Sequence, residues 1–164
     1  MNLTMNWNRI LKVLVQSKKA NRFFSIATVD SEGNPHITPI GHVFFREDGT
    51  CYYFDEYSEA MPRNFQSNRH VCVMAVNSSA RFWLISLFRG QFRQAPAVRL
   101  KGIVGDRRDA SKEEIEVLQK SISSTRFLKG HRLLWGNLTK VRDIEFYDFS
   151  PAEYPVMCDG LWLE

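Results

Sequence analysis

The residue types that could carry chemistry are scattered through this sequence. The four histidines and three cysteines are widely spaced, at His36, His42, His70, His131, Cys51, Cys72 and Cys158. Paired Cys and His spacings would mark a zinc site, so we expect no metal. No Ser or Cys has a spacing that indicates a nucleophile with a base and an orienting group. The catalytic residues are therefore unknown from the sequence, and side chains alone define no reaction class.

The stretch GNPHITPIGHVFF, residues 33–45, raises a structural question. Its strand-forming residues are interrupted by Pro39, which has no N–H to donate to a sheet. A central strand excludes such a residue, whereas an edge strand or a bulge tolerates it. Whatever lies beside Pro39 must therefore do without a hydrogen bond from its backbone nitrogen.

The positive charge is concentrated in one segment. The net charge is +4. Within residues 81–108, Asp106 is the one acidic residue beside the cations Arg81, Arg89, Arg93, Arg99, Lys101, Arg107 and Arg108. This excess favours an anionic partner, and a phosphorylated small molecule satisfies it as well as nucleic acid does. The aromatic and basic residues 81–95 could stack on a single strand of nucleic acid. They could equally form a lid over a ligand cleft or pack in a dimer, which we favour, so no nucleic-acid partner is expected.

The length and composition predict one soluble domain over residues 1–164. The chain is 44% hydrophobic and 24% charged, and no apolar run approaches the ~18 residues that span a membrane. No membrane partner is therefore expected. The first residues lack the basic start, apolar centre and cleavage site of a signal peptide, which predicts a cytoplasmic location.

Periodicity and turn residues predict the order of the elements. Helical patterns occur at 6–16, over one or two turns within 58–68, and at 112–122, where Ser111 and Glu114 form a capping box. Residues 80–96 form an irregular or partly helical insertion, and a C-terminal helix and strand occupy 111–149. The predicted strands are 23–30, 36–45, 50–55, 70–77, 98–106 and 141–149.

Six strands with short connections and only peripheral helices predict a mainly β fold. Such a pattern is typical of an antiparallel barrel rather than a doubly wound sheet. The sequence has no regular βαβ alternation and no GxGxxG motif. A Rossmann-type dinucleotide site is therefore not supported.

An ordered set of segments resembles a known family. GNPHITPI, DGTCYYFD and MPRNFQSNRHVCVMAV, followed by PAVRLKGIVGDRRDASKEEI and VRDIEF, are similar to the pyridoxamine 5′-phosphate oxidase-like family of flavin-binding split β-barrels. The similarity covers roughly residues 20–149, and the order of the motifs carries it more than any single motif. It implies a six-stranded antiparallel split barrel that forms a homodimer, with FMN in each of two clefts at the subunit interface.

The resemblance assigns eight cofactor-binding positions. They are His36, Ile37, Thr38, Pro39, Phe54, Asp55, Arg63 and Asn64. The first four match the strand against the isoalloxazine ring, the next two match the end of the following strand near the ring and ribityl chain, and the last two match a helix start that holds the phosphate. A flat ligand beside the first strand would explain Pro39, and so would an ordinary edge strand.

This chain departs from the family pattern at two places. Met61 stands where the family usually has a lysine that helps neutralise the phosphate, which leaves Arg63 as the cation of the motif. Arg99, Lys101 or Arg126 are candidates for the missing charge. The arginine–histidine pattern that binds substrate in the true oxidases has no match in residues 155–164, so that activity is not expected.

The sequence therefore predicts an FMN-binding oxidoreductase of unknown substrate, with reduced nicotinamide or another reduced small molecule as electron donor. Trp135 either lies over a flavin edge from the second subunit or fills the barrel end or the dimer interface. An alternative is a binding module without redox chemistry, which uses the same barrel for haem, a deazaflavin or another anionic planar ligand. A nucleic-acid binder that uses residues 81–108 is a third hypothesis.

Overall fold

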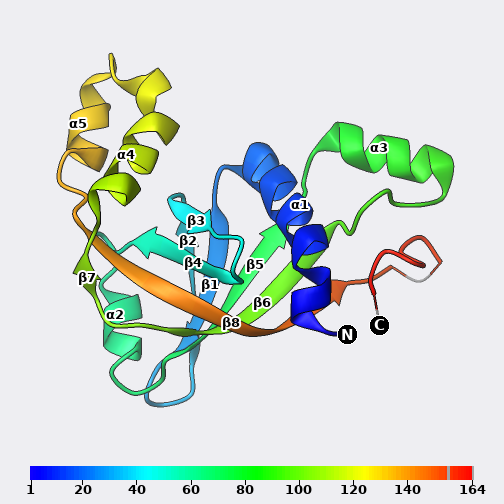
Figure 1. Cartoon of the computed structure of the whole chain (residues 1–164), viewed down its shortest axis with the longest axis horizontal. Coiled ribbons are helices and arrows are strands. Elements are labelled where there is room, and N and C mark those ends of the chain that lie inside the picture. Colours follow the sequence, from blue (N-terminus) through cyan, green and yellow to red (C-terminus); the bar gives the residue numbers. More distant parts are fainter. Residues whose placement is uncertain (155, 164) are drawn as a thin grey trace.

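One antiparallel sheet, curled into a half-barrel, organises the chain (Figure 1). The computed structural model describes residues 1–154 and 156–163, apart from the side chains of Thr125 and Arg132. Within them the strands are β1 (Phe24–Val29), β2 (Pro35–Ile40), β3 (Val43–Phe45), β4 (Thr50–Phe54), β5 (His70–Val76), β6 (Ala97–Val104), β7 (Arg108–Asp109) and β8 (Lys140–Ala152). The helices are α1 (Leu3–Asn21), α2 (Ala60–Asn64), α3 (Ala80–Arg89), α4 (Lys112–Ser121) and α5 (Lys129–Trp135), with a 3₁₀ helix at Ser123–Thr125.

The strand order confirms the predicted split barrel and corrects the strand count. Neighbouring strands follow the order β2-β1-β5-β6-β8-β4-β3, and β7 pairs with β8. The predicted strand 36–45 is two strands, because β2 pairs with β1 while β3 pairs with β4. Gly41 and His42 connect β2 to β3, the strands at the two ends of the strand order. These two strands are joined there by the chain and not by a β-ladder. The described sheet thus has seven strands on its main path instead of six.

Pro39 lies on a strand at the sheet edge. It is opposite Ser25 of β1, and β2 ends the strand order on that side. An edge strand needs hydrogen bonds on one side only, so a missing N–H is tolerated there. This position confirms the edge-strand explanation, and the flat ligand beside β2 stays a prediction.

Helix α1 fills the concave side of the sheet. Its buried Ile10, Val13 and Leu14 belong to the same apolar cluster as Val73 and Leu100 of the central strands. The helix begins after Asn2, whose side chain accepts a hydrogen bond from the N–H of Met5, and it runs beyond the predicted 6–16 at both ends. In the described part of the chain, no helix is long and apolar enough to cross a membrane.

The remaining helices match the sequence unevenly. Helix α2 lies within the predicted 58–68, and α4 begins at the predicted capping box, where the Glu114 N–H donates to Ser111 Oγ at 3.2 Å. Residues 80–89 of the predicted insertion are the helix α3, and α5 was not predicted. Figure 1 shows α3 projecting on one side of α1 and the pair α4–α5 projecting on the other.

Candidate functional site

A cavity of about 210 Å³ opens where the two ends of the sheet meet. We call it the candidate cavity. It is lined by the β2–β3 link, by the end of β4 and by residues of and after α5. Pro39 and Phe54, two of the eight predicted cofactor-binding residues, are among its lining residues. The split of the barrel therefore brings parts of two predicted strands to one opening.

Trp135 of α5 lies at this cavity. Its ring meets the rings of His42 and His131 edge to face, with centroids 5.8 and 5.0 Å away. The Tyr57 hydroxyl donates to the carbonyl of Leu134 at 2.6 Å, which ties α5 to the segment that precedes α2. The indole thus contacts the cavity of its own chain, an arrangement that the residue order did not indicate.

A second opening, which we call the basic groove, adjoins the candidate cavity. The two share Gly41, His42 and Trp135 as lining residues. The basic groove has a volume of about 530 Å³ and also contains the cations Lys18, Lys19 and Arg22. These cations lie in the last turn and at the end of α1. From the sequence alone, cations at this place indicate only a favourable interaction with the helix dipole. Their position next to the cavity supplies positive charge for an anionic group.

His42 is a neutral imidazole at this site. Burial, with a smaller contribution from the Lys18 ammonium, lowers the pKa of His42 to about 4. The Lys18 Nζ donates to the carbonyl of Gly41, and burial lowers the pKa of this lysine as well. At pH 7 the imidazole can therefore accept a hydrogen bond or ligate a metal.

The four predicted residues of β2 are the most open part of the candidate site. His36, Ile37 and Pro39 are exposed, and Thr38 is half-buried. The Thr38 Oγ1 atom is buried and has no hydrogen-bond partner in the described part of the chain. Buried polar groups without a partner are uncommon, and Thr38 is not among the lining residues of the candidate cavity or the basic groove.

Asp55 and Asn64 face the interior instead. The Asp55 carboxylate is fully buried and accepts from Arg142 Nε at 2.6 Å, while its Oδ1 has no partner within the described residues. The Asn64 Nδ2 donates to Thr28 Oγ1 at 2.9 Å, which fastens α2 to β1. These two predicted site residues hold the scaffold together.

The region around α2 does not replace the family lysine. Met61 has no exposed surface and belongs to the core, whereas Arg63 is exposed. Of the three proposed substitutes, Arg99 and Lys101 lie on the outer side of β6, and Lys101 pairs with Asp148 at 2.8 Å. Neither these two nor Arg126 is among the lining residues of the candidate cavity or the basic groove. The cations of α1 are therefore the ones that the structure brings to the site.

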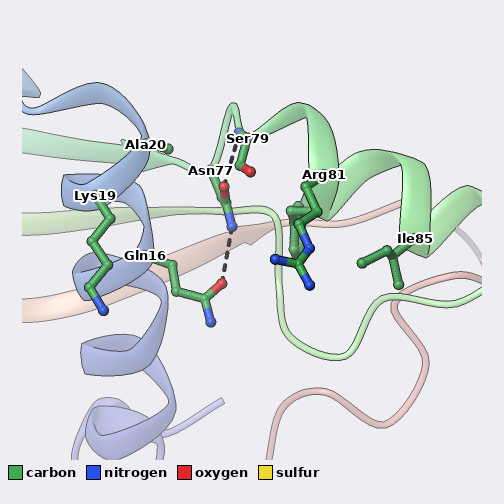
Figure 2. A pocket seen from close by; sticks show the side chains of 8 residues that line it. Gln16, Lys19, Ala20, Asn77, Ser79, Arg81 and Ile85 are labelled. Carbon is green, nitrogen blue, oxygen red and sulfur yellow. Dashed lines mark hydrogen bonds between the residues drawn. The ribbon is translucent and has the colours of Figure 1, made fainter.

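The predicted basic segment borders a different groove. Helix α3 and α1 enclose a volume of about 420 Å³ that Figure 2 shows from close by, with Lys19 and Arg81 on its two sides. None of the eight predicted residues lines it. Within one chain, α3 is therefore not a lid over the candidate cavity. Among the described residues, no group of three or more His, Cys, Asp or Glu side chains could hold a metal ion.

The half-barrel sheet, with an aromatic cavity where its two ends meet, defines the fold class as a split β-barrel. Residues 10–143 match the family model described as pyridoxamine 5′-phosphate oxidase. The chain belongs to this family, which confirms the resemblance found in the sequence. No curated protein matches the chain.

Solved structures show the same fold at low identity. An FMN-binding protein from Syntrophomonas wolfei superposes with a TM-score of 0.62 at 11% identity, over 92% of this chain and 90% of that chain. HupZ from Group A Streptococcus gives 0.56 at 15% identity, over 87% and 92%. HutZ, the heme storage protein from Vibrio cholerae, gives 0.54 at 14% identity, over 92% and 95%. At such identities the comparisons support the fold alone.

Proposed function

We propose that this protein is a homodimeric FMN-binding oxidoreductase that holds its cofactor at the split of the barrel. The observation that carries the proposal is the candidate cavity itself, which opens on Pro39 and Phe54 and continues into the cationic basic groove. The flat ring of FMN needs an apolar slot, and the phosphate at the far end of the molecule needs cations. Both are present within one continuous set of lining residues.

The residues of the site divide the work of holding FMN. Pro39, Phe54 and Trp135 supply apolar surface for the ring, and the unpartnered Thr38 hydroxyl supplies a polar contact at β2. Two sets of cations are available for the phosphate, Arg63 on α2 and the α1 group of Lys18, Lys19 and Arg22. Bound FMN would serve as the acceptor of a hydride or of electrons from reduced nicotinamide or another reduced substrate.

The test is an absorption spectrum followed by titrations. We expect the purified protein to be yellow, with an absorption band near ~450 nm that is released on denaturation, because the cofactor is the chromophore. Apoprotein should bind FMN more tightly than riboflavin, which lacks the phosphate. A colourless protein that binds neither compound would contradict the proposal.

Haem binding is a second candidate, favoured by His42. Its neutral imidazole lines the candidate cavity beside Trp135, and neutral imidazole is a common iron ligand. HutZ, which has a similar fold, is described as a heme storage protein. If this candidate is correct, added haem gives a Soret shift that His42→Ala removes, whereas FMN binding by the same variant persists.

A further inference from the structure

A further pocket lies where the two ends of the chain meet. It has a volume of about 290 Å³ and is lined by α1, by the segment between α3 and β6, and by residues 160–162. We call it the terminal pocket. Figure 1 shows the beginning of α1 next to the C-terminal segment. None of the residues that line the terminal pocket lines the candidate cavity or the basic groove, so it is separate from the proposed flavin site.

Hydrogen bonds fasten the three segments around the terminal pocket to one another. The buried Asn6 of α1 donates from Nδ2 to the carbonyl of Leu163 and accepts from the N–H of Leu163, both at 2.8 Å. The N–H of Phe92, in the segment between α3 and β6, donates to the carbonyl of Met157 at 2.9 Å. A pocket that is ordered before binding loses less conformational entropy when a ligand arrives. The terminal pocket is therefore formed in advance by the fold.

Three cations line the terminal pocket, and no acidic residue is among its described lining residues. The cations are Arg9 and Lys12 of α1 and Arg93 of the segment that precedes β6. Arg9 and Lys12 are three positions apart, so they lie on one side of the helix. In the described part of the chain, none of the three side chains forms an ion pair with a carboxylate. Like charges around one pocket repel one another, so the binding of an anion relieves this repulsion.

The terminal pocket also has hydrogen-bond donors to spare. The Nε1 atom of Trp162, one of the lining residues, is buried and has no partner among the described residues. A buried donor without an acceptor is uncommon in a folded protein. Arg9 donates from Nη1 to the carbonyl of Leu161 at 2.5 Å, and its guanidinium has further N–H groups. An anion with several oxygens would give these donors the acceptors that they lack.

We propose that the terminal pocket binds the diphosphate group of a small molecule. A phosphate monoester carries about −1.5 to −2 charges at pH 7, so it leaves at least one of the three cations without a counter-charge, whereas a diphosphate group can engage all three. The guanidinium groups of Arg9 and Arg93 match phosphate oxygens in a bidentate geometry. The volume of about 290 Å³ is small for an organic ligand site, which favours a compact group. This binding does not depend on the proposed function.

The test is isothermal titration calorimetry of the full chain, in the presence and absence of FMN, with inorganic diphosphate and ADP as probes. Lys12→Gln and Arg93→Gln should each weaken diphosphate binding about tenfold, because each removes one charge-assisted contact. Both side chains are exposed and have no hydrogen-bond or ion-pair partner in the described residues, so neither change should disturb the fold. Trp162→Phe keeps an aromatic ring, removes the indole N–H and should weaken binding about threefold.

The matched control is Arg22→Gln, which removes the same charge from the basic groove. It should leave diphosphate binding unchanged, whereas Arg93→Gln should leave FMN binding unchanged. The two probes separate the sources of the group. Binding of inorganic diphosphate alone assigns the terminal pocket to the free ion, and binding of ADP as well assigns it to diphosphate esters. Either result supports the proposal when Lys12→Gln and Arg93→Gln weaken it.

Several outcomes would overturn the inference. These are no binding of either probe at millimolar concentration, equal weakening by Arg22→Gln and Arg93→Gln, or sulfate binding as tightly as diphosphate. A single-stranded DNA oligomer that binds more tightly than ADP, and is lost in the Lys12→Gln and Arg93→Gln variants, would assign the terminal pocket to nucleic acid instead. Each of these results leaves the proposed function standing. Diphosphate binding of the expected kind in a protein that binds no FMN supports the inference and contradicts only the proposed function.

Discussion

Strand β2 and the segment from the end of β4 to α2 each carry four predicted site residues, and they use their polar groups in opposite ways. Asp55 pairs with Arg142 inside the protein, and Asn64 donates to Thr28. On β2 the Thr38 Oγ1 atom has no partner among the described residues, and the residues on either side of it are exposed. Asp55 and Asn64 thus make internal contacts, although Asp55 Oδ1 has no partner in the described residues, whereas the Thr38 hydroxyl makes no contact of this kind.

This difference separates stability from binding within one motif. A polar residue with a partner inside the protein stabilises the fold, and its loss leaves the partner buried and unpaired. A polar residue without a partner adds little to stability and can contact a ligand. Substitutions in the two regions should therefore change different measurements.

The largest effect is expected for Arg142→Ala. It removes the partner of Asp55, whose carboxylate has no exposed surface, and an unpaired buried charge costs about 3–5 kcal/mol. We expect the free energy of unfolding in urea to fall by that amount. The control is Asp148→Asn, which breaks the exposed pair with Lys101 and should cost less than about 1 kcal/mol. Equal losses for the two variants would refute the distinction between buried and exposed pairs.

Glu114 extends the comparison to the scaffold beneath α4. Its carboxylate accepts from Arg108 and Arg46 and from the Ser111 N–H. The Arg108 hydrogen bonds, opposed by burial, lower the pKa of Glu114, so its stabilisation is present above the ordinary value of 4.5 and is lost as the pH falls through the lower folded value. Asp143, held by Arg108 and Arg46, also has a lowered pKa.

Glu114→Gln should lower the free energy of unfolding by about 2 kcal/mol at pH 7, and by progressively less as the pH falls below about 4. Urea unfolding at a series of pH values measures this. Glu116→Gln on the same helix, whose side chain is exposed, is the matched control and should leave the curve unchanged. A loss that stays constant down to pH 2 would mean that the charge of Glu114 is not the source.

The sequence predicted most of the fold because its signals are local. Alternation marked β6, an apolar run marked the central β5, and the Ser111–Glu114 pair marked the start of α4. The break at Gly41 and His42 could not be read in the same way. It depends on which strand each half of 36–45 pairs with, and that is settled only when the sheet curls.

The candidate site was predictable only in part. Pro39 and Phe54, which the family pattern assigns to the cofactor, line the candidate cavity, whereas His42 and Trp135 come from a strand link and from an unpredicted helix far along the chain. The position of the family lysine is filled by Met61, which points into the core. No local pattern indicates that cations from the end of α1 reach the same opening.

An effect of intermediate size is expected when the two sets of cations are compared. Arg22 lines the basic groove beside the candidate cavity, and Arg63 is exposed on α2. We expect Arg22→Gln to weaken FMN binding about tenfold, the effect of losing one charge-assisted contact to phosphate, and to leave riboflavin binding unchanged. Arg63→Gln is the paired variant in the same titrations. If it alone weakens FMN binding, the phosphate lies at α2 and the basic groove has another role.

The smallest effect is expected at Thr38 of β2, which can be compared with Thr28 of β1, the hydrogen-bond partner of Asn64. Thr38→Val keeps the side-chain shape and removes a hydroxyl that is buried and unpartnered, a change that is neutral or slightly stabilising for the apoprotein. If this hydroxyl contacts the ligand, the same variant should bind FMN about threefold more weakly, as expected for one neutral hydrogen bond. Thr28→Val is the matched control, because its Oγ1 accepts from Asn64, and it should lower stability without a direct effect on binding. Thermal unfolding and FMN titration of both variants therefore give opposite patterns if Thr38 contacts the ligand and Thr28 only supports Asn64. Matching patterns would contradict the distinction between the unpartnered hydroxyl on β2 and the partnered Asn64 on α2.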